Sequence, residues 1–96
     1  ALIARLPALT DSVLLEGWAG LYEMTPDHNP ILGEYPKQSG FYVASGFSGH
    51  GLMMAPATGR AMADLLTTGE SNALDIGVFD PERFTRGELF WDDAMI

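Results

Sequence analysis

The stretch GFSGHGLMMAPATGR, from Gly46 to Arg60, places three glycines within six positions directly before an alanine- and methionine-rich run. The preceding residues FYVAS, Phe41–Ser45, are aromatic and β-branched and have glycine on both sides, which predicts a strand. From about Met53 to Thr68, apolar side chains recur on one side of a helix, and Gly69 is a suitable residue to end it. The order strand, glycine-rich turn and helix is the central fold prediction.

The start of the predicted helix is suited to hold a ligand. The first N–H groups of a helix have no partner within it, and the helix dipole places partial positive charge there. Glycine at positions 46, 49 and 51 would let a ligand approach the backbone closely. The spacing G-x-x-G-x-G is neither the dinucleotide fingerprint G-x-G-x-x-G nor a P-loop. On spacing alone, a tight turn with a polar loop histidine, His50, is therefore the alternative interpretation.

The remaining segments predict short strands and turns. We expect a bent strand over Val13–Met24, a proline-rich turn over Thr25–Pro30 and a short strand over Ile31–Tyr35. FDPERF, Phe79–Phe84, predicts a short helix capped by Asp80, with an aromatic tail that packs on another part of the protein. The expected fold class is α+β, with short antiparallel strands and one main helix. Its segments are about 10–40, about 41–68 and 69–96.

Composition excludes several classes of function. The chain has 96 residues, a formal net charge of −8 and no cysteine. The acidic charge disfavours nucleic-acid binding, and no apolar run has the length of a membrane span. Two histidines, His28 and His50, without organised carboxylates make no metal site. The absence of cysteine excludes disulfides and favours a reducing compartment, so we expect a cytoplasmic protein.

Two longer phrases, in this order, carry a family resemblance. GFYVASGFSGHGLMMAPATGRAMADLL, Gly40–Leu66, closely resembles the carboxy-terminal flavin-contact segment of the glycine oxidase, sarcosine oxidase and D-amino acid oxidase family. WAGLYEMTPDHNPILGE, Trp18–Glu34, resembles the strand-and-turn region upstream of it. With FDPERF, the chain is most similar to the sarcosine oxidase β-subunit and dimethylglycine dehydrogenase-like branch.

The resemblance implies that the chain is the carboxy-terminal fragment of a two-domain, FAD-dependent amine or amino-acid oxidoreductase. In that family a Rossmann-type amino-terminal domain holds most of the FAD, and this chain lacks that domain. The loop Ser48–Met53 would lie along the pyrimidine edge of the flavin, where backbone amides favour the negative charge of the reduced ring. The implied cofactor-binding residues are Gly46, Ser48, Gly49, His50, Gly51, Leu52 and Met53.

Three positions depart from the family pattern. Monomeric sarcosine oxidases have a lysine at the position of Met53, so the role of that lysine is not expected here. They also link FAD to a cysteine at the position that matches Gly20, so this chain forms no cysteinyl link. Glycine oxidases have a carboxylate-binding arginine close to Tyr22. The resemblance leaves His50 and Tyr22 as candidates near the substrate, although a loop-holding histidine and a half-buried strand tyrosine are the alternatives.

The expected function is hydride transfer from a secondary or tertiary amine, such as sarcosine, dimethylglycine or proline, to flavin. The fragment alone is expected to be inactive. Its partners would be the small substrate, the missing domain and, through exposed apolar surface, further copies of itself. Two alternatives stay open: a small acidic module that binds a protein or ligand without catalysis, and a scaffold that has lost its activity.

Overall fold

The computed structural model describes residues 2–91. Its helices are α1 (Leu2–Arg5), α2 (Gly51–Thr68) and α3 (Arg83–Arg86), with the short 3-10 turns η1 (Pro7–Leu9) and η2 (Gly77–Phe79). Two strands, β1 (Ile31–Glu34) and β2 (Tyr42–Ser45), form an antiparallel sheet. The expected α+β class, with one main helix and antiparallel strands, is confirmed for the described residues.

β1 and β2 are the arms of a hairpin in which Ile31 pairs with Ser45 and Glu34 with Tyr42. The loop is closed by the Tyr35 amide, which donates to the carbonyl of Phe41 at 2.7 Å. The Gly40 amide donates to the Glu34 carboxylate at 2.6 Å. The hairpin ends directly before the glycine-rich loop, so it fixes where that loop leaves the sheet.

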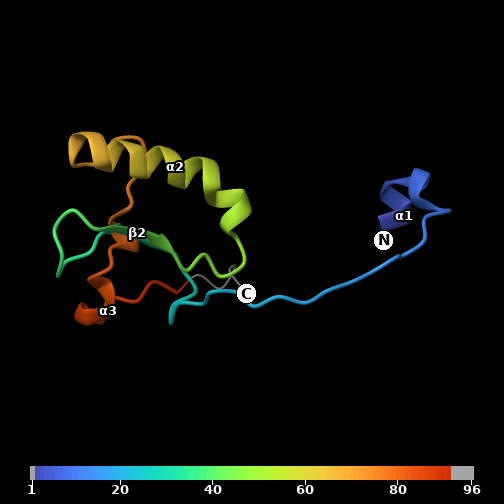
Figure 1. Cartoon of the computed structure of the whole chain (residues 1–96), viewed down its shortest axis with the longest axis horizontal. Coiled ribbons are helices and arrows are strands. Elements are labelled where there is room, and N and C mark those ends of the chain that lie inside the picture. Colours follow the sequence, from blue (N-terminus) through green and yellow to red (C-terminus); the bar gives the residue numbers. More distant parts are fainter. Residues whose placement is uncertain (1, 92–96) are drawn as a thin grey trace.

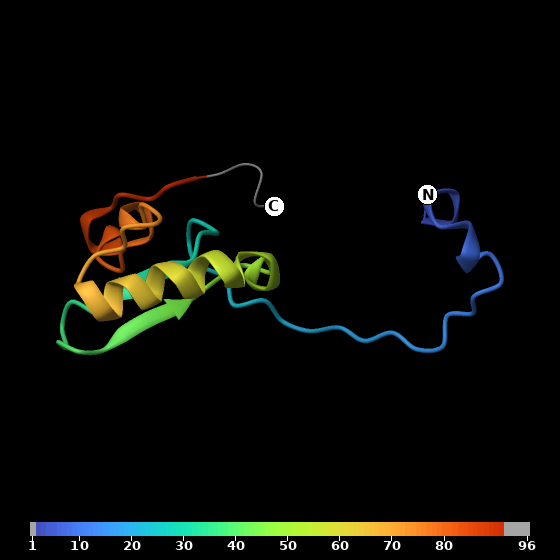
Figure 2. The ribbon, with the colours of Figure 1, turned by 90° about the horizontal axis from the view of Figure 1, so that it is seen from above.

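α2 lies across the hairpin, as Figures 1 and 2 show. The core between them is small and is centred on Leu32 and Ala61, which are both buried. α2 begins at Gly51, two residues before the predicted start, and Pro56 lies inside it at the sixth position. Because proline has no N–H, the hydrogen bond to the carbonyl four residues earlier is missing there. Gly69 ends the helix at φ 82°, and its amide donates to Leu65, as predicted.

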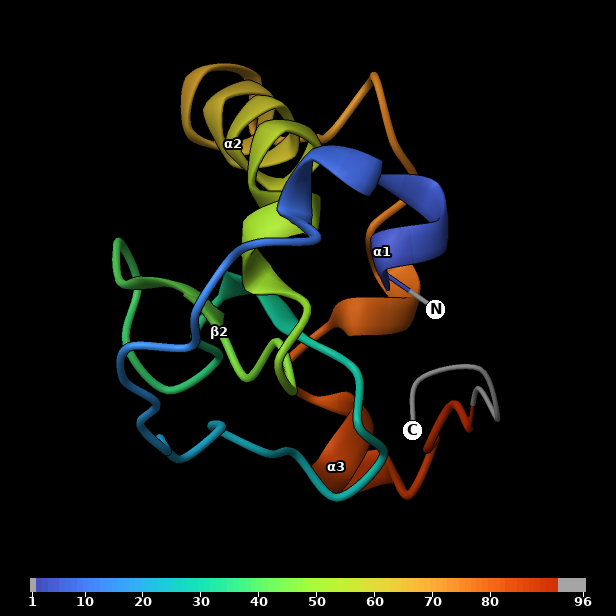
Figure 3. The same cartoon turned by 90° about the vertical axis from the view of Figure 1, so that its right-hand side faces the viewer.

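The predicted strand over Val13–Met24 is wrong in this structure. These residues are extended but make no strand, and they lead away from the hairpin to α1 (Figures 1 and 2). Figure 3 views the molecule from the side on which α1 lies. A β-strand needs a neighbour that accepts and donates its backbone hydrogen bonds, and no strand of the described residues pairs with this segment. The Ser48 amide donates to the Glu23 carbonyl near its end, but a single hydrogen bond makes no ladder. The large apolar side chains are correspondingly exposed: Val13, Leu14, Leu15, Trp18 and Leu21.

The segment after α2 returns beneath the hairpin. Asp80 accepts a hydrogen bond from the Glu82 amide at 2.9 Å, so it caps the turn that leads into α3, although α3 itself begins only at Arg83. The rings of His28 and Trp91 meet edge to face, with centroids 6.1 Å apart. The aromatic tail therefore packs on the Thr25–Pro30 turn. Residues 92–96 of the predicted 69–96 segment lie outside the described part.

No helix in the described part of the chain is long and apolar enough to cross a membrane. Within the same residues, no group of three or more histidine and acidic side chains is arranged to hold a metal ion.

Candidate functional site

The loop between β2 and α2 has an unusual backbone. Gly46, Ser48 and Gly49 all have positive φ, at 73°, 51° and 88°. The loop is held by its own polar groups, because Ser48 Oγ donates to the Gly46 carbonyl at 3.3 Å. The His50 Nδ1 lies 3.1 Å from the Ser48 carbonyl, which can only accept, so Nδ1 carries the proton. His50 therefore holds the loop through one nitrogen and keeps Nε2 for another contact.

Residues 22–25 run beside this loop. The Ser48 amide donates to the Glu23 carbonyl at 3.2 Å. A Cβ atom added to Gly46 would lie 2.5 Å from Thr25 Cγ2. Glycine at position 46 is therefore required by the chain's own packing as well as by its positive φ. A role for this glycine in ligand contact stays a prediction.

Tyr22 is brought to the same loop. Its ring lies against Gly49, and its side chain is 68% exposed. The alternative of a half-buried tyrosine in a strand is wrong in this structure, because Tyr22 lies in an extended segment and faces solvent. The two candidate residues near the substrate, Tyr22 and His50, thus sit on the two segments that form the site.

The start of α2 offers open donors. Among the described residues, the amides of Gly51, Leu52 and Met53 have no hydrogen-bond acceptor, and the first bond is that of Met54 to the His50 carbonyl. His50 precedes the helix without capping it through its side chain. Leu52 and Met53 are 95% and 74% exposed, whereas Gly51 is half-buried and has the Phe47 side chain beside it. Free amides and the helix dipole make it a place for an anionic or carbonyl oxygen.

Behind the loop lies a buried ion pair that the sequence did not suggest. Arg83 donates through Nε and Nη2 to the two carboxylate oxygens of Asp27, at 2.7 and 2.9 Å. Its other N–H groups donate to the carbonyls of Asn29, Phe79 and Asp80. All five guanidinium N–H groups therefore have an acceptor. Arg83 and Asp27 are 1% and 0% exposed.

The pair controls the charge of Asp27. Burial by itself raises the pKa of the Asp27 carboxyl group. Hydrogen bonds from Arg83, the Asn29 amide and Thr25, together with the positive charge of Arg83, outweigh burial and lower the pKa to about 2. Asp27 is therefore a structural anion at neutral pH and is unsuited to act as a general base.

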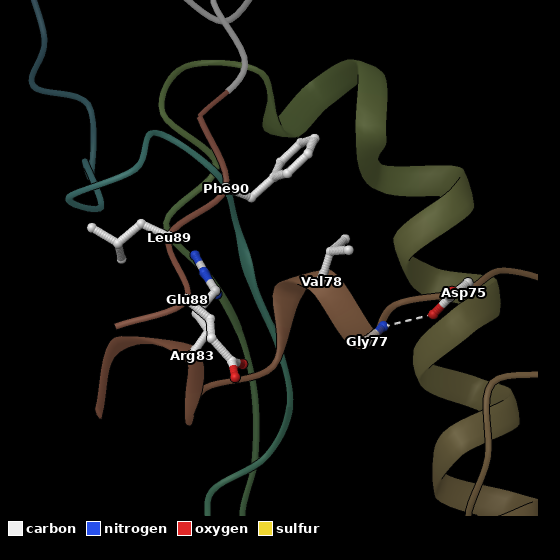
Figure 4. Close-up of a pocket in the computed structure, with 7 residues that line it drawn as sticks. All are labelled: Asp75, Gly77, Val78, Arg83, Glu88, Leu89 and Phe90. Atoms are coloured by element: carbon white, nitrogen blue, oxygen red, sulfur yellow. Dashed lines mark hydrogen bonds between the residues drawn. The ribbon is translucent and has the colours of Figure 1, made fainter. Parts of the chain in front are cut away.

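A cavity of about 390 Å³ opens beside Arg83, between the segments 75–78 and 88–90 (Figure 4). Its wall includes Val78, Leu89 and Phe90. Because the Arg83 donors already have acceptors, the cavity offers no unpaired guanidinium N–H to an anionic ligand. It is a less suitable functional site than the start of α2.

The Asp27–Arg83 pair was missed because its partners are 56 positions apart. Asp27 belongs to the phrase TPD, which predicts a turn, and Arg83 belongs to FDPERF, in which Asp80 predicts a helix cap. An aspartate in a turn gives no sign of burial. The only signal was the presence of both phrases in the family pattern.

Comparison with known proteins identifies the family. The family described as FAD dependent oxidoreductase matches residues 1–65, which include both the Tyr22–Thr25 segment and the glycine-rich loop. The chain belongs to this family. It is 40% identical over 96 residues to FAD-dependent oxidoreductase domain-containing protein 1 of Bos taurus, a match that covers 99% of the chain and 20% of that protein.

Other family members extend the comparison. Monomeric sarcosine oxidase of Bacillus sp. is 37% identical, with 73% of this chain and 18% of the oxidase covered. The crystal structure of L-proline dehydrogenase from P. horikoshii superposes with a TM-score of 0.76 at 46% identity. That match covers 93% of this chain and 24% of the dehydrogenase. The chain thus spans about a fifth to a quarter of the length of these relatives.

Proposed function

We propose that this family member supplies the flavin-contacting segment of an FAD-dependent oxidoreductase that acts on a secondary or tertiary amine or an amino acid, such as sarcosine, dimethylglycine or proline. Family membership supports the FAD, and similarity to proteins named glycine oxidase, monomeric sarcosine oxidase and L-proline dehydrogenase supports the substrate class. The observation that carries the proposal is the set of unpaired amides at Gly51, Leu52 and Met53. They directly follow the loop in which Gly49 contacts the Tyr22 ring.

The donor chemistry of this site fits FAD. Amides at a helix start, without competing side chains, suit the carbonyl oxygens and ring nitrogen of a flavin edge. The residues that would hold it are Gly46, Ser48, Gly49, His50, Gly51, Leu52 and Met53. The chemistry that bound FAD supplies is acceptance of a hydride from the carbon next to the amine nitrogen. The contribution of the chain is electrostatic, because its amides and the helix dipole stabilise negative charge at this edge.

Tyr22 and His50 take different roles in this proposal. The Tyr22 ring packs on Gly49 and exposes its other face, so it forms an aromatic wall beside the substrate amine. His50 is oriented by the Ser48 carbonyl and supports the loop, and its Nε2 is left for a further contact. Neither residue has a neighbouring carboxylate among the hydrogen bonds of the loop, so neither is proposed as a general base.

The 96-residue chain by itself is proposed to be inactive and to bind FAD weakly. It contains no dinucleotide fingerprint, so the pyrophosphate of FAD would have to be held by other residues of a longer polypeptide. Family membership favours this interpretation over an independent acidic module.

The test uses the full-length polypeptide that carries this sequence. The purified protein is expected to contain FAD and to lose its visible absorption when sarcosine, dimethylglycine or proline is added without oxygen. A colourless protein, or a flavin that none of a panel of amines reduces, would contradict the proposal. Retained flavin with no reduction would instead favour a scaffold.

A pair of charge variants tests the site itself. Because Met53 is exposed and lies in the first turn of α2, Met53→Lys should raise and Met53→Glu should lower the flavin midpoint potential. Ala63→Lys and Ala63→Glu are the controls, since Ala63 is also exposed on α2 but lies about 15 Å further along the axis. Equal shifts at both positions would place the flavin elsewhere.

A further inference from the structure

We propose that Arg83 is a positioning residue for the loop that precedes α2, and that it acts through Asp27 and Thr25. The inference rests on the proposed function, because the loop Gly46–His50 contains four of the residues assigned there to the flavin and leads into the other three. Arg83 lies on α3, far from the loop in sequence. Within the described part of the chain, its hydrogen bonds go to Asp27, Asn29, Phe79 and Asp80 and none goes to the loop, so it acts through the residues between them.

The first step of the connection is ionic. The guanidinium group of Arg83 donates to both carboxylate oxygens of Asp27, and this bidentate contact fixes the orientation of the carboxylate. Lysine has one ammonium group and cannot reproduce that planar, two-point contact. Both partners are buried, so water does not compete with the hydrogen bonds.

The second step runs through Thr25, which uses both branches of its side chain. Its hydroxyl group lies 3.1 Å from Asp27 Oδ1 and 2.7 Å from the Asn29 carbonyl. Its methyl group, Cγ2, lies against the backbone of Gly46, so closely that a Cβ atom there would be only 2.5 Å away. Thr25 is 8% exposed. The hydroxyl group ties Thr25 to the ion pair, and the methyl group sets the position of Gly46.

The third step is the loop itself. Gly46 accepts a hydrogen bond from Ser48 Oγ, and the Ser48 amide donates to the Glu23 carbonyl, two residues before Thr25. Ser48 is 4% exposed. A displacement of Thr25 therefore moves both borders of the loop, the Gly46 turn and the Glu23 contact. The orientation of the amides at the start of α2 depends on that loop.

Four variants of the full-length polypeptide separate the steps. Arg83→Lys keeps the positive charge but loses the bidentate contact with Asp27. Thr25→Ser keeps the hydroxyl group and removes the methyl group that meets Gly46, whereas Thr25→Val does the reverse. Arg86→Met is the matched control, since Arg86 lies on the same helix and pairs with Asp80, Glu82 and Glu88 at the surface.

The first measurement is amide hydrogen exchange, which needs no flavin. The rate for peptides covering 46–50 is divided by the rate for peptides within 57–68 of α2, so that a general loss of stability cancels. Arg83→Lys, Thr25→Ser and Thr25→Val should each raise this ratio, by about tenfold where a hydrogen bond to a charged group is lost. Arg86→Met should leave it unchanged. An unchanged ratio in Arg83→Lys overturns the inference.

The second measurement is the midpoint potential and visible spectrum of the bound flavin. Arg83→Lys and Thr25→Ser should shift the potential relative to wild type, whereas Arg86→Met should not. Faster exchange in the loop with an unchanged potential also overturns the inference. Should Arg83→Lys fail to fold, the two Thr25 variants decide by the same criteria.

The two proposals fail in different ways. If the wild-type protein holds no flavin, the proposed function fails, and the exchange ratio alone decides whether Arg83 positions the loop. If all variants hold flavin with the same potential and the same exchange ratio, the function stands and Arg83 has only a structural role.

Discussion

The ring of Tyr22 lies directly on Gly49, so that a Cβ atom at position 49 would be 2.8 Å from Tyr22 Cε2. This contact joins an extended segment that forms no strand to the loop before α2. It also explains the glycine at position 49, which has φ 88° and faces an aromatic ring. The site is thus built from two segments that are separate in sequence.

The Tyr22 contact leads to a prediction about its hydroxyl group. If the ring acts as a wall, Tyr22→Phe should keep the rate of anaerobic flavin reduction close to wild type, and Tyr22→Ala should lose most of it. The measurement is stopped-flow reduction of the full-length protein by its amine substrate. A large loss in Tyr22→Phe would show that the hydroxyl group takes part.

Gly46 and Gly59 provide a matched pair for stability. Gly46→Ala should destabilise the protein by about 1–3 kcal/mol, because Gly46 has φ 73° and the added methyl group meets Thr25. Gly59→Ala should stabilise it by about 0.5–1 kcal/mol, since Gly59 lies inside α2 with open space around it. Both values come from urea unfolding. Combining Gly46→Ala with Thr25→Ser should recover the part due to the clash but leave the cost of positive φ.

The ion pair predicts a loss of stability in acid. The Asp27 pKa is about 2 in the folded chain, whereas an unperturbed aspartate, as in the unfolded chain, has a pKa of 3.8. The folded state therefore gains about 2 kcal/mol from this group above pH 4. That stabilisation should disappear as the pH falls from about 4 to 2. The free energy of unfolding of wild type and Asp27→Asn should therefore converge over this range. Parallel curves would mean that Asp27 does not titrate as described.

The exposed stretch predicts self-association of the isolated 96-residue chain. Leu14, Leu15, Trp18 and Leu21 are each more than 90% exposed, and the described residues do not cover them. Such a run of exposed apolar side chains favours contact with another copy. Light scattering should show a species larger than a monomer, and replacing Leu14, Leu15 and Leu21 by serine should reduce its mass. A strictly monomeric wild type would contradict this expectation.

Sequence patterns over a few neighbouring residues predicted the elements that depend mainly on those residues. β2 and α2 could be predicted because β-branched and aromatic residues, helical periodicity and flanking glycines act over a few neighbouring positions. The C-terminal end of α2 at Gly69 was correct for the same reason. Its start came two residues early, because the sequence pattern does not show that Gly51 already has helical geometry.

The error over Val13–Met24 has a different cause. Apolar residues there have the composition of a strand, yet strand formation depends on a neighbouring strand, and none lies beside this segment in the described residues. Composition gives a segment a preference for the strand conformation, but a strand forms only where a neighbouring strand pairs with it.

The amino-acid sequence alone determined the order strand, loop and helix, the family, and the glycine-rich loop as the candidate site. Each of these depends on neighbours along the chain or on a recognisable phrase. Only the tertiary structure decided that Tyr22 covers Gly49 and that Asp27 is buried against Arg83. Those contacts join positions far apart in sequence, and burial and hydrogen bonding arise only when the folded backbone brings such positions together.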